Sequence, residues 1–152
     1  MTRAAPPNTP GHNVGIDEPM IHDLVHTFYG RVRSDELLAP VFQAAVKDWD
    51  PHLAKLCDFW SSVLLMTGRY KGTPMVAHAA LPSLSGRHFD QWLNLFRATA
   101  RECCPPDAAA LFVDRAERIA QSLELGTALH RGISLKVGER LAGCPAHGIR
   151  TQ

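Results

Sequence analysis

The stretch WDPHLAKLCDFWSSVLLMTGRYKGTPMVAH, residues 49–78, decides the fold because it joins one long helix to one short helical segment. Asp50 can cap a helix whose first residue is Pro51, a position where the missing N–H of proline does no harm. Apolar side chains then recur at intervals of three and four residues as far as Thr67, which predicts an amphipathic helix of about four turns. Gly68 is placed to end it.

Two histidines bracket the apolar part of this stretch. His52 is predicted on the first turn of the long helix. Thr73 and Pro74 form a second cap-and-proline start, and His78 lies one turn inside the short segment that follows. Alanines flank His78, so a large flat group could approach its imidazole closely. Spacing alone leaves open whether His78 is a ligand or a solvated loop histidine.

Three further helices are predicted from capping residues and apolar periodicity, at residues 17–33, 86–102 and 107–126. Asp17, Ser85 and Asp107 are their predicted N-caps. The last helix either frays near Gly126 or continues to about Arg131, and the sequence leaves both possibilities open.

The region between the first two long helices is predicted to be mostly irregular. Asp35 starts a single short turn that ends at Pro40, Phe42 follows as an apolar anchor, and residues 43–48 form a loop. No segment shows the period-two alternation of a strand. The sequence therefore predicts an all-α domain.

The two ends of the chain are predicted to lie outside this domain. Residues 1–16 are rich in Pro, Gly, Asn and Thr and are expected to bury almost nothing, so they are interpreted as a mobile N-terminal leader. Residues 17–130 form the predicted domain, and the weakly patterned residues 131–152 form a C-terminal extension.

Composition excludes several classes of function. The formal net charge of +1 and the lack of a basic run argue against nucleic acid as a partner. The apolar runs are too short to span a membrane. The four cysteines form neither a disulfide framework nor a CxxC pair, so a reducing cytoplasm is the expected location.

Four blocks of sequence, in this order and spacing, resemble a truncated haemoglobin, and more narrowly one of group III. These blocks are FYGRVRSDELLAPVF (28–42), residues 49–78, LP (81–82) and HFDQWLNLF (88–96). The chain also lacks the Gly-Gly pairs that groups I and II usually carry. The resemblance covers about residues 17–125. It implies a globin-like two-over-two helical sandwich enclosing haem b, in which the helices at 17–33 and 50–67 cross the other pair.

The resemblance also assigns residues to the haem by position. It makes His78 the proximal ligand of the iron and the metal-binding residue. Tyr29, His52 and Trp92 then line the distal side, where a diatomic gas binds. The remaining cofactor-binding residues it implies are Phe42 against the porphyrin and Arg69 and Tyr70 near the propionates. His88 is a further residue that could approach a propionate.

The residue types fit this chemistry. A single neutral imidazole leaves one coordination position of haem iron open. Tyr29 can donate an O–H and Trp92 an N–H to a gas ligand that gains negative charge at the iron, although taken alone each could be a packed core aromatic. His52 could contact the ligand, gate the pocket or face solvent, and the helix dipole disfavours its charged form.

Two functions remain open at this point. The first is binding of O2, NO or CO at a single five-coordinate iron, for oxygen binding, carriage, or the handling of NO and redox stress. The alternative is a haem enzyme, an NO dioxygenase or a peroxidase-like catalyst. No GxGxxG motif for a flavin or nicotinamide is present, so turnover would need an external reductase. A cofactor-free helical interaction domain is the third and plainest possibility.

Overall fold

The computed structural model describes residues 8–71, 84–133, 135–136 and 139–142. Its helices are α1 (Pro10–Asn13), α2 (Glu18–Val32), α3 (Ala39–Ala45), α4 (Trp49–Leu65), α6 (Gly86–Cys103) and α7 (Pro106–His130). Helices are the only regular elements in these described ranges, which confirms the predicted all-α class.

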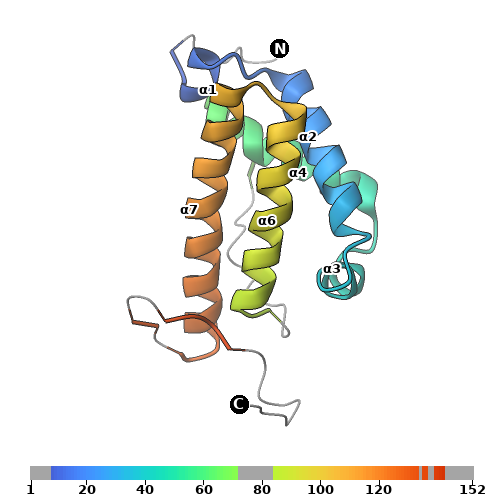
Figure 1. Cartoon of the computed structure of the whole chain (residues 1–152), viewed down its shortest axis with the longest axis vertical. Coiled ribbons are helices and arrows are strands. Elements are labelled where there is room, and N and C mark those ends of the chain that lie inside the picture. Colours follow the sequence, from blue (N-terminus) through green and yellow to red (C-terminus); the bar gives the residue numbers. More distant parts are fainter. Residues whose placement is uncertain (1–7, 72–83, 134, 137–138, 143–152) are drawn as a thin grey trace.

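The four long helices form two layers. In Figure 1, α6 and α7 lie side by side and run in opposite directions, and α2 crosses this pair at an angle. Helix α2 contacts both α6 and α4, so α2 and α4 form one layer and α6 and α7 the other. This arrangement is the predicted two-over-two sandwich.

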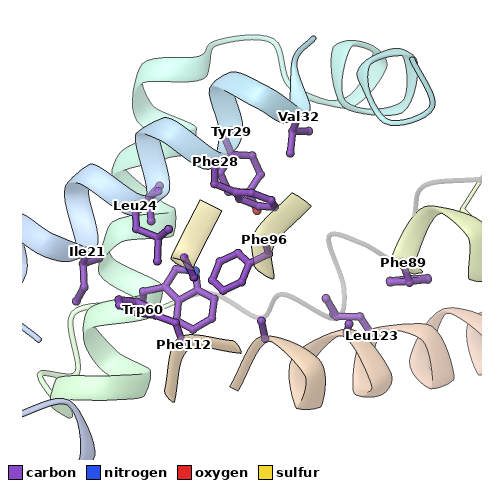
Figure 2. Packing of buried hydrophobic residues seen from close by; sticks show 14 of the residues in the cluster. Ile21, Leu24, Phe28, Tyr29, Val32, Trp60, Phe89, Phe96, Phe112 and Leu123 are labelled. Carbon is purple, nitrogen blue, oxygen red and sulfur yellow. The ribbon is translucent and has the colours of Figure 1, made fainter. Parts of the chain in front are cut away.

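Aromatic side chains from all four long helices meet in the core. Trp60 of α4 stacks on Phe96 of α6 with ring centroids 5.3 Å apart, and Phe112 of α7 meets Trp60 edge-on at 5.7 Å. Phe28 of α2 meets Phe96 edge-on at 5.0 Å. Figure 2 shows this cluster at the crossing of the helices, with Phe89 and Leu123 lying further along α6 and α7. Such pairs add specific ring geometry to the burial of apolar surface.

Helix α2 follows its sequence signals closely. The Asp17 carboxylate accepts a hydrogen bond from the backbone N–H of Met20 at 3.0 Å, and Pro19 occupies the first turn. The residues that face the core are Ile21, Leu24, Val25, Phe28, Tyr29 and Val32, as the three- and four-residue spacing predicts. Tyr29 is thereby fixed on the inner side of the helix.

The predicted limits of α4 are wrong by a few residues. Asp48, not Asp50, is the N-cap and accepts the N–H of Asp50, so the helix begins at Trp49. Asp50 then lies in the first turn, where the helix dipole favours a carboxylate. The helix ends at Leu65 rather than Thr67, because Met66 adopts a left-handed conformation with φ of 54°.

The segment after α2 is more regular than predicted. The backbone N–H groups of Leu37 and Leu38 both donate to the Asp35 carboxylate, which makes the expected turn. Helix α3 then follows at Ala39–Ala45, where a loop was expected from residue 43. Phe42 is therefore a buried helical residue, held by the inward face of α3.

The expectation that residues 1–16 bury almost nothing is wrong for the part that the structure describes. The side chains of Thr9 and Ile16 are buried, and α1 packs against α4 and α7. At Gly11 the backbones come so close that an added Cβ would lie 2.8 Å from the Leu64 carbonyl oxygen. A Pro- and Gly-rich composition here marks a tight docking contact.

Helix α7 begins one residue before the expected cap and runs to His130. Pro105 is the N-cap, so Asp107 lies in the first turn and does not cap the helix. Part of the C-terminal extension packs back onto the helices. The Arg140 guanidinium pairs with Asp90 of α6 at 2.8 Å and with Glu124 of α7 at 3.0 Å. The predicted boundary near residue 130 nevertheless stays a prediction.

Candidate distal pocket

Tyr29 is the polar centre of the candidate site. Its side chain is 4% exposed, and its ring lies 6.0 Å from Phe42 and 6.2 Å from His52 between centroids. Burial raises the pKa of the Tyr29 phenol to about 12, and a side-chain hydrogen bond with Trp92 opposes that shift in part. The phenol is therefore protonated and able to donate throughout the neutral pH range.

Trp92 brings a second donor from α6. The indole lies beside Tyr29 and stacks on Phe96, with centroids 5.5 Å apart and an interplanar angle of 13°. Phe28 meets it edge-on at 5.3 Å. Two packed rings therefore fix the orientation of the indole, and α2 and α6 together bring Tyr29 and Trp92 into contact.

His52 lies in the first turn of α4, as predicted, and its ring lies beside Tyr29. Its ring is half-buried and stands at 87° to the Tyr29 ring. Trp49 meets the same imidazole edge-on at 5.4 Å and lies beside Phe42 with centroids 6.4 Å apart. The start of α4 thus closes this side of the pocket with an imidazole and an indole.

An apolar pocket lies on the side of Phe42 and Trp92 that faces away from Tyr29. Its walls come from α3, α6 and α7 and from the segment just before α6, and they are Leu38, Phe42, Leu84, His88, Phe89, Trp92, Ala120 and Leu123. Phe89 and Leu123 are the two residues that Figure 2 shows away from the central cluster. Tyr29 lies directly behind this wall, in contact with both Phe42 and Trp92.

The rim of the pocket near α7 carries positive charge. Arg131 donates a hydrogen bond to the carbonyl oxygen of Leu84 at 2.8 Å, so its guanidinium lies at the edge of the wall. Burial lowers the pKa of His88, with further contributions from Arg87 and Arg131. An anionic group at this edge would meet both guanidinium charges.

Arg69 and Tyr70, the residues assigned to the propionates, make other contacts. The Arg69 guanidinium pairs with the Glu18 carboxylate at 2.9 Å. The Tyr70 backbone N–H donates to the Ser62 hydroxyl at 2.9 Å, and its ring meets Phe59 edge-on. Their role toward haem stays a prediction. His78, the predicted iron ligand, lies outside the described residues, so its assignment is also untested.

Sequence reasoning missed two parts of this site. Trp49 was assigned no role, although it forms the wall between Phe42 and His52. Arg131 was also assigned no role, although it marks the rim. The position of Trp49 three residues before His52, in the same helical turn, was a usable signal. Nothing in the sequence brings Arg131 to Leu84, because 47 residues separate them.

These residues fit haem. The pocket supplies an apolar wall for a flat ring, two hydrogen-bond donors behind one face, and cationic groups at the rim for carboxylates. Among the described residues, no group of three or more His, Cys, Asp or Glu could hold a free metal ion. Haem iron in globins needs a single imidazole from the protein, so its ligand does not depend on such a group.

Known proteins support the same fold. The family model described as bacterial-like globin matches residues 12–121. The group 3 truncated haemoglobin ctb of Campylobacter jejuni subsp. jejuni is 32% identical over 113 residues, which cover 72% of this chain and 89% of that protein.

Two solved structures are similar to this chain. The crystal structure of a group III truncated haemoglobin from C. jejuni matches with a TM-score of 0.69 and 30% identity, over 82% of this chain and 95% of that one. The haemoglobin of the thermophilic phototrophic bacterium Chloroflexus aurantiacus matches with a TM-score of 0.62 over 76% and 96%, and at 23% identity it supports the fold alone. The chain therefore belongs to the bacterial-like globins, among the group III truncated haemoglobins, and is a haem-binding globin.

Proposed function

We propose that this globin binds haem b with His78 as the proximal ligand and takes up a diatomic gas, O2, NO or CO, on the side of Tyr29, Trp92 and His52. The observation that carries this proposal is the buried Tyr29 phenol, with the Trp92 indole beside it, behind the apolar pocket wall. When bound, haem supplies an iron with one coordination position open to a gas.

Tyr29 and Trp92 act as hydrogen-bond donors toward that gas. The raised pKa of Tyr29 keeps its proton on the phenol oxygen at neutral pH. Burial removes competing water, so a donor aimed at a ligand with partial negative charge is worth more than it would be in solvent. Because neighbouring rings already fix the Trp92 indole, its orientation changes little when a ligand arrives.

His52 and Trp49 control the side of the pocket formed by the start of α4. Both rings lie within reach of Tyr29 and are half-buried, so they shield the donors from solvent. A short displacement of this first helical turn would open a path between solvent and Tyr29. His52 is therefore the residue we assign to gating.

The rim cations hold the carboxylates of the cofactor in this proposal. Arg131 and Arg87 lie beside His88, which lines the pocket. In this proposal the anionic edge of haem lies at the start of α6 and the end of α7. Phe42 packs against the ring from α3.

Haem uptake tests the first part of the proposal. The purified protein should show a Soret band, and His78→Ala should lose it or regain it only with added imidazole. A colourless protein that takes up no haemin would contradict the proposal. Because the neighbours of His78 in the sequence are alanines and alanine favours helix, circular dichroism of the two haem-free proteins should show equal helix content.

Oxygen release tests the role of the donors. Tyr29→Phe keeps the packed ring but removes the O–H, and Trp92→Phe keeps an aromatic ring without the N–H. Stopped-flow measurement should show oxygen dissociation faster by about tenfold or more in each, as expected for loss of one hydrogen bond to a charged group. Tyr70→Phe is the matched control, because Tyr70 packs on Phe59 instead. Equal rates in all three variants would mean that Tyr29 and Trp92 only pack.

A reductase-dependent enzyme is the second candidate. Two donors behind one ligand face favour slow oxygen release, which suits NO dioxygenation or peroxide chemistry better than carriage. Measuring NO consumption with an added reductase system distinguishes the enzyme from the binding function. Many turnovers per haem support the enzyme, and a single stoichiometric turnover supports the binding function.

We also propose a cytoplasmic location. The described cysteines, Cys57, Cys103 and Cys104, are free thiols, which agrees with a reducing cytoplasm. Among the described helices, none is long and apolar enough to cross a membrane.

A further inference from the structure

Helix α2 carries two histidines one turn apart on its outer face. The imidazoles of His22 and His26 stack with their centroids 4.0 Å apart and an interplanar angle of 21°. Residues four apart on a helix lie one above the other, so both rings project from the same strip of surface. The inner face of the same helix holds Phe28 and Tyr29, so this pair is separate from the haem pocket.

Acidic groups surround the pair. The Asp23 carboxylate lies 3.7 Å from the Nδ1 atom of His22, and 80% of its side chain is exposed. Asp50, on the first turn of α4, acts on His26 by its negative charge. The local field of these carboxylates is therefore favourable for a cation.

The imidazole of His26 favours its neutral form, in which it can act as a metal ligand. Burial lowers the pKa of His26 and the neighbouring His22 lowers it further, while Asp50 and Asp23 raise it. The net direction is downward, so the ring nitrogen holds a free lone pair at neutral pH. Two charged imidazolium rings would repel each other at this separation, and two neutral ones can share a ligand.

We propose that His22 and His26 form a surface chelate site for a late first-row divalent metal ion. Imidazole nitrogen suits Cu²⁺, Ni²⁺ and Zn²⁺, and the general affinity order places Cu²⁺ first. The protein supplies two nitrogen ligands, and water completes the coordination sphere. Both side chains are exposed, so they can turn their ring nitrogens toward one ion without disturbing the core.

The strength of the site comes from chelation. Once one imidazole has bound the ion, the helix presents the second at high effective concentration, and that advantage disappears when either ring is removed. The haem-loaded protein titrated calorimetrically with Cu²⁺ should therefore show one site that His22→Gln and His26→Gln each weaken by about a hundredfold. Electron paramagnetic resonance should show two nitrogen ligands on the ion in the unaltered protein.

A change of helical register is the matched control. The double variant His26→Gln/Thr27→His keeps the number of histidines but moves the second ring to an exposed position on another face of α2. The proposal predicts the same loss of Cu²⁺ affinity as in His26→Gln. Full affinity in the shifted variant, or unchanged affinity in both single variants, would overturn the proposal. Soret and circular dichroism spectra are expected to be unaltered in all of them.

Discussion

At the scale of the residue, Tyr29 illustrates how the fold sets a side chain's chemistry. Its phenol is buried among Phe28, Phe42 and the rings of α4, and its polar atom has Trp92 as partner. An ionised phenolate would lose the solvation that water gives it. The fold therefore stabilises the protonated form, and ionisation of Tyr29 must act against folding.

This coupling predicts a loss of stability at alkaline pH. The pKa of Tyr29 is about 12 in the folded chain and about 10 for a free tyrosine, so its contribution is complete below about pH 10 and is lost as pH rises toward 12. Two pKa units correspond to about 3 kcal/mol. Denaturant unfolding between about pH 9 and 12 should show this extra decline in the unaltered protein but not in Tyr29→Phe. Parallel curves for the two proteins would contradict the prediction.

The same scale shows what a sequence can say about a site. Tyr29, His52 and Trp92 were assigned together because the sequence blocks that contain them resemble a truncated haemoglobin, and the structure brings the three into one cluster. Arg131 was missed because its neighbour Leu84 is distant in sequence. Chemistry-bearing residue types can be identified from local patterns, whereas charges that reach a pocket from another helix depend on tertiary packing.

At the scale of the element, long helices were predictable and short ones were not. The core face of α2 follows from periodicity, because apolar residues recur at helical spacing over about four turns. Helices α1 and α3 have too few residues for a period to emerge, so turn-forming composition dominated their interpretation. Their helicity depends on packing against α4 and the rest of the core.

The close packing of α1 against α4 predicts a loss of stability when Gly11 is enlarged. Gly11 lies so close to α4 that a Cβ would meet the Leu64 carbonyl oxygen at 2.8 Å and the Leu65 side chain at 2.7 Å. Gly11→Ala should therefore destabilise the protein by about 1–3 kcal/mol, although alanine favours helix. Thermal unfolding should show the lower midpoint. Gly30→Ala, also within a helix but with open space around its Cβ, is the control and should raise or keep the midpoint.

At the scale of the whole molecule, bound haem would contact several helices at once, including helices that the protein core holds together only in part. Tyr29 on α2 and His52 on α4 lie behind one wall of the pocket, and Phe42 on α3 lines it. The arginines at its rim belong to the start of α6 and the end of α7. A ligand that binds only the folded chain stabilises it by mass action. Contacts at the rim should therefore appear as slower loss of haem.

Arg131 allows that claim to be tested. In Arg131→Gln, transfer of haem to an acceptor globin should be faster by about fivefold, as expected for loss of a partly exposed ion pair of about 1 kcal/mol. Reconstitution with haem dimethyl ester removes the carboxylates, and the variant and the unaltered protein should then lose haem at equal rates. Arg118→Gln is the control, because Arg118 pairs with Asp114 on the exposed surface of α7. If Arg131→Gln also accelerates loss of the ester, the side chain acts through its hydrogen bond to Leu84 and shapes the pocket wall without holding a carboxylate.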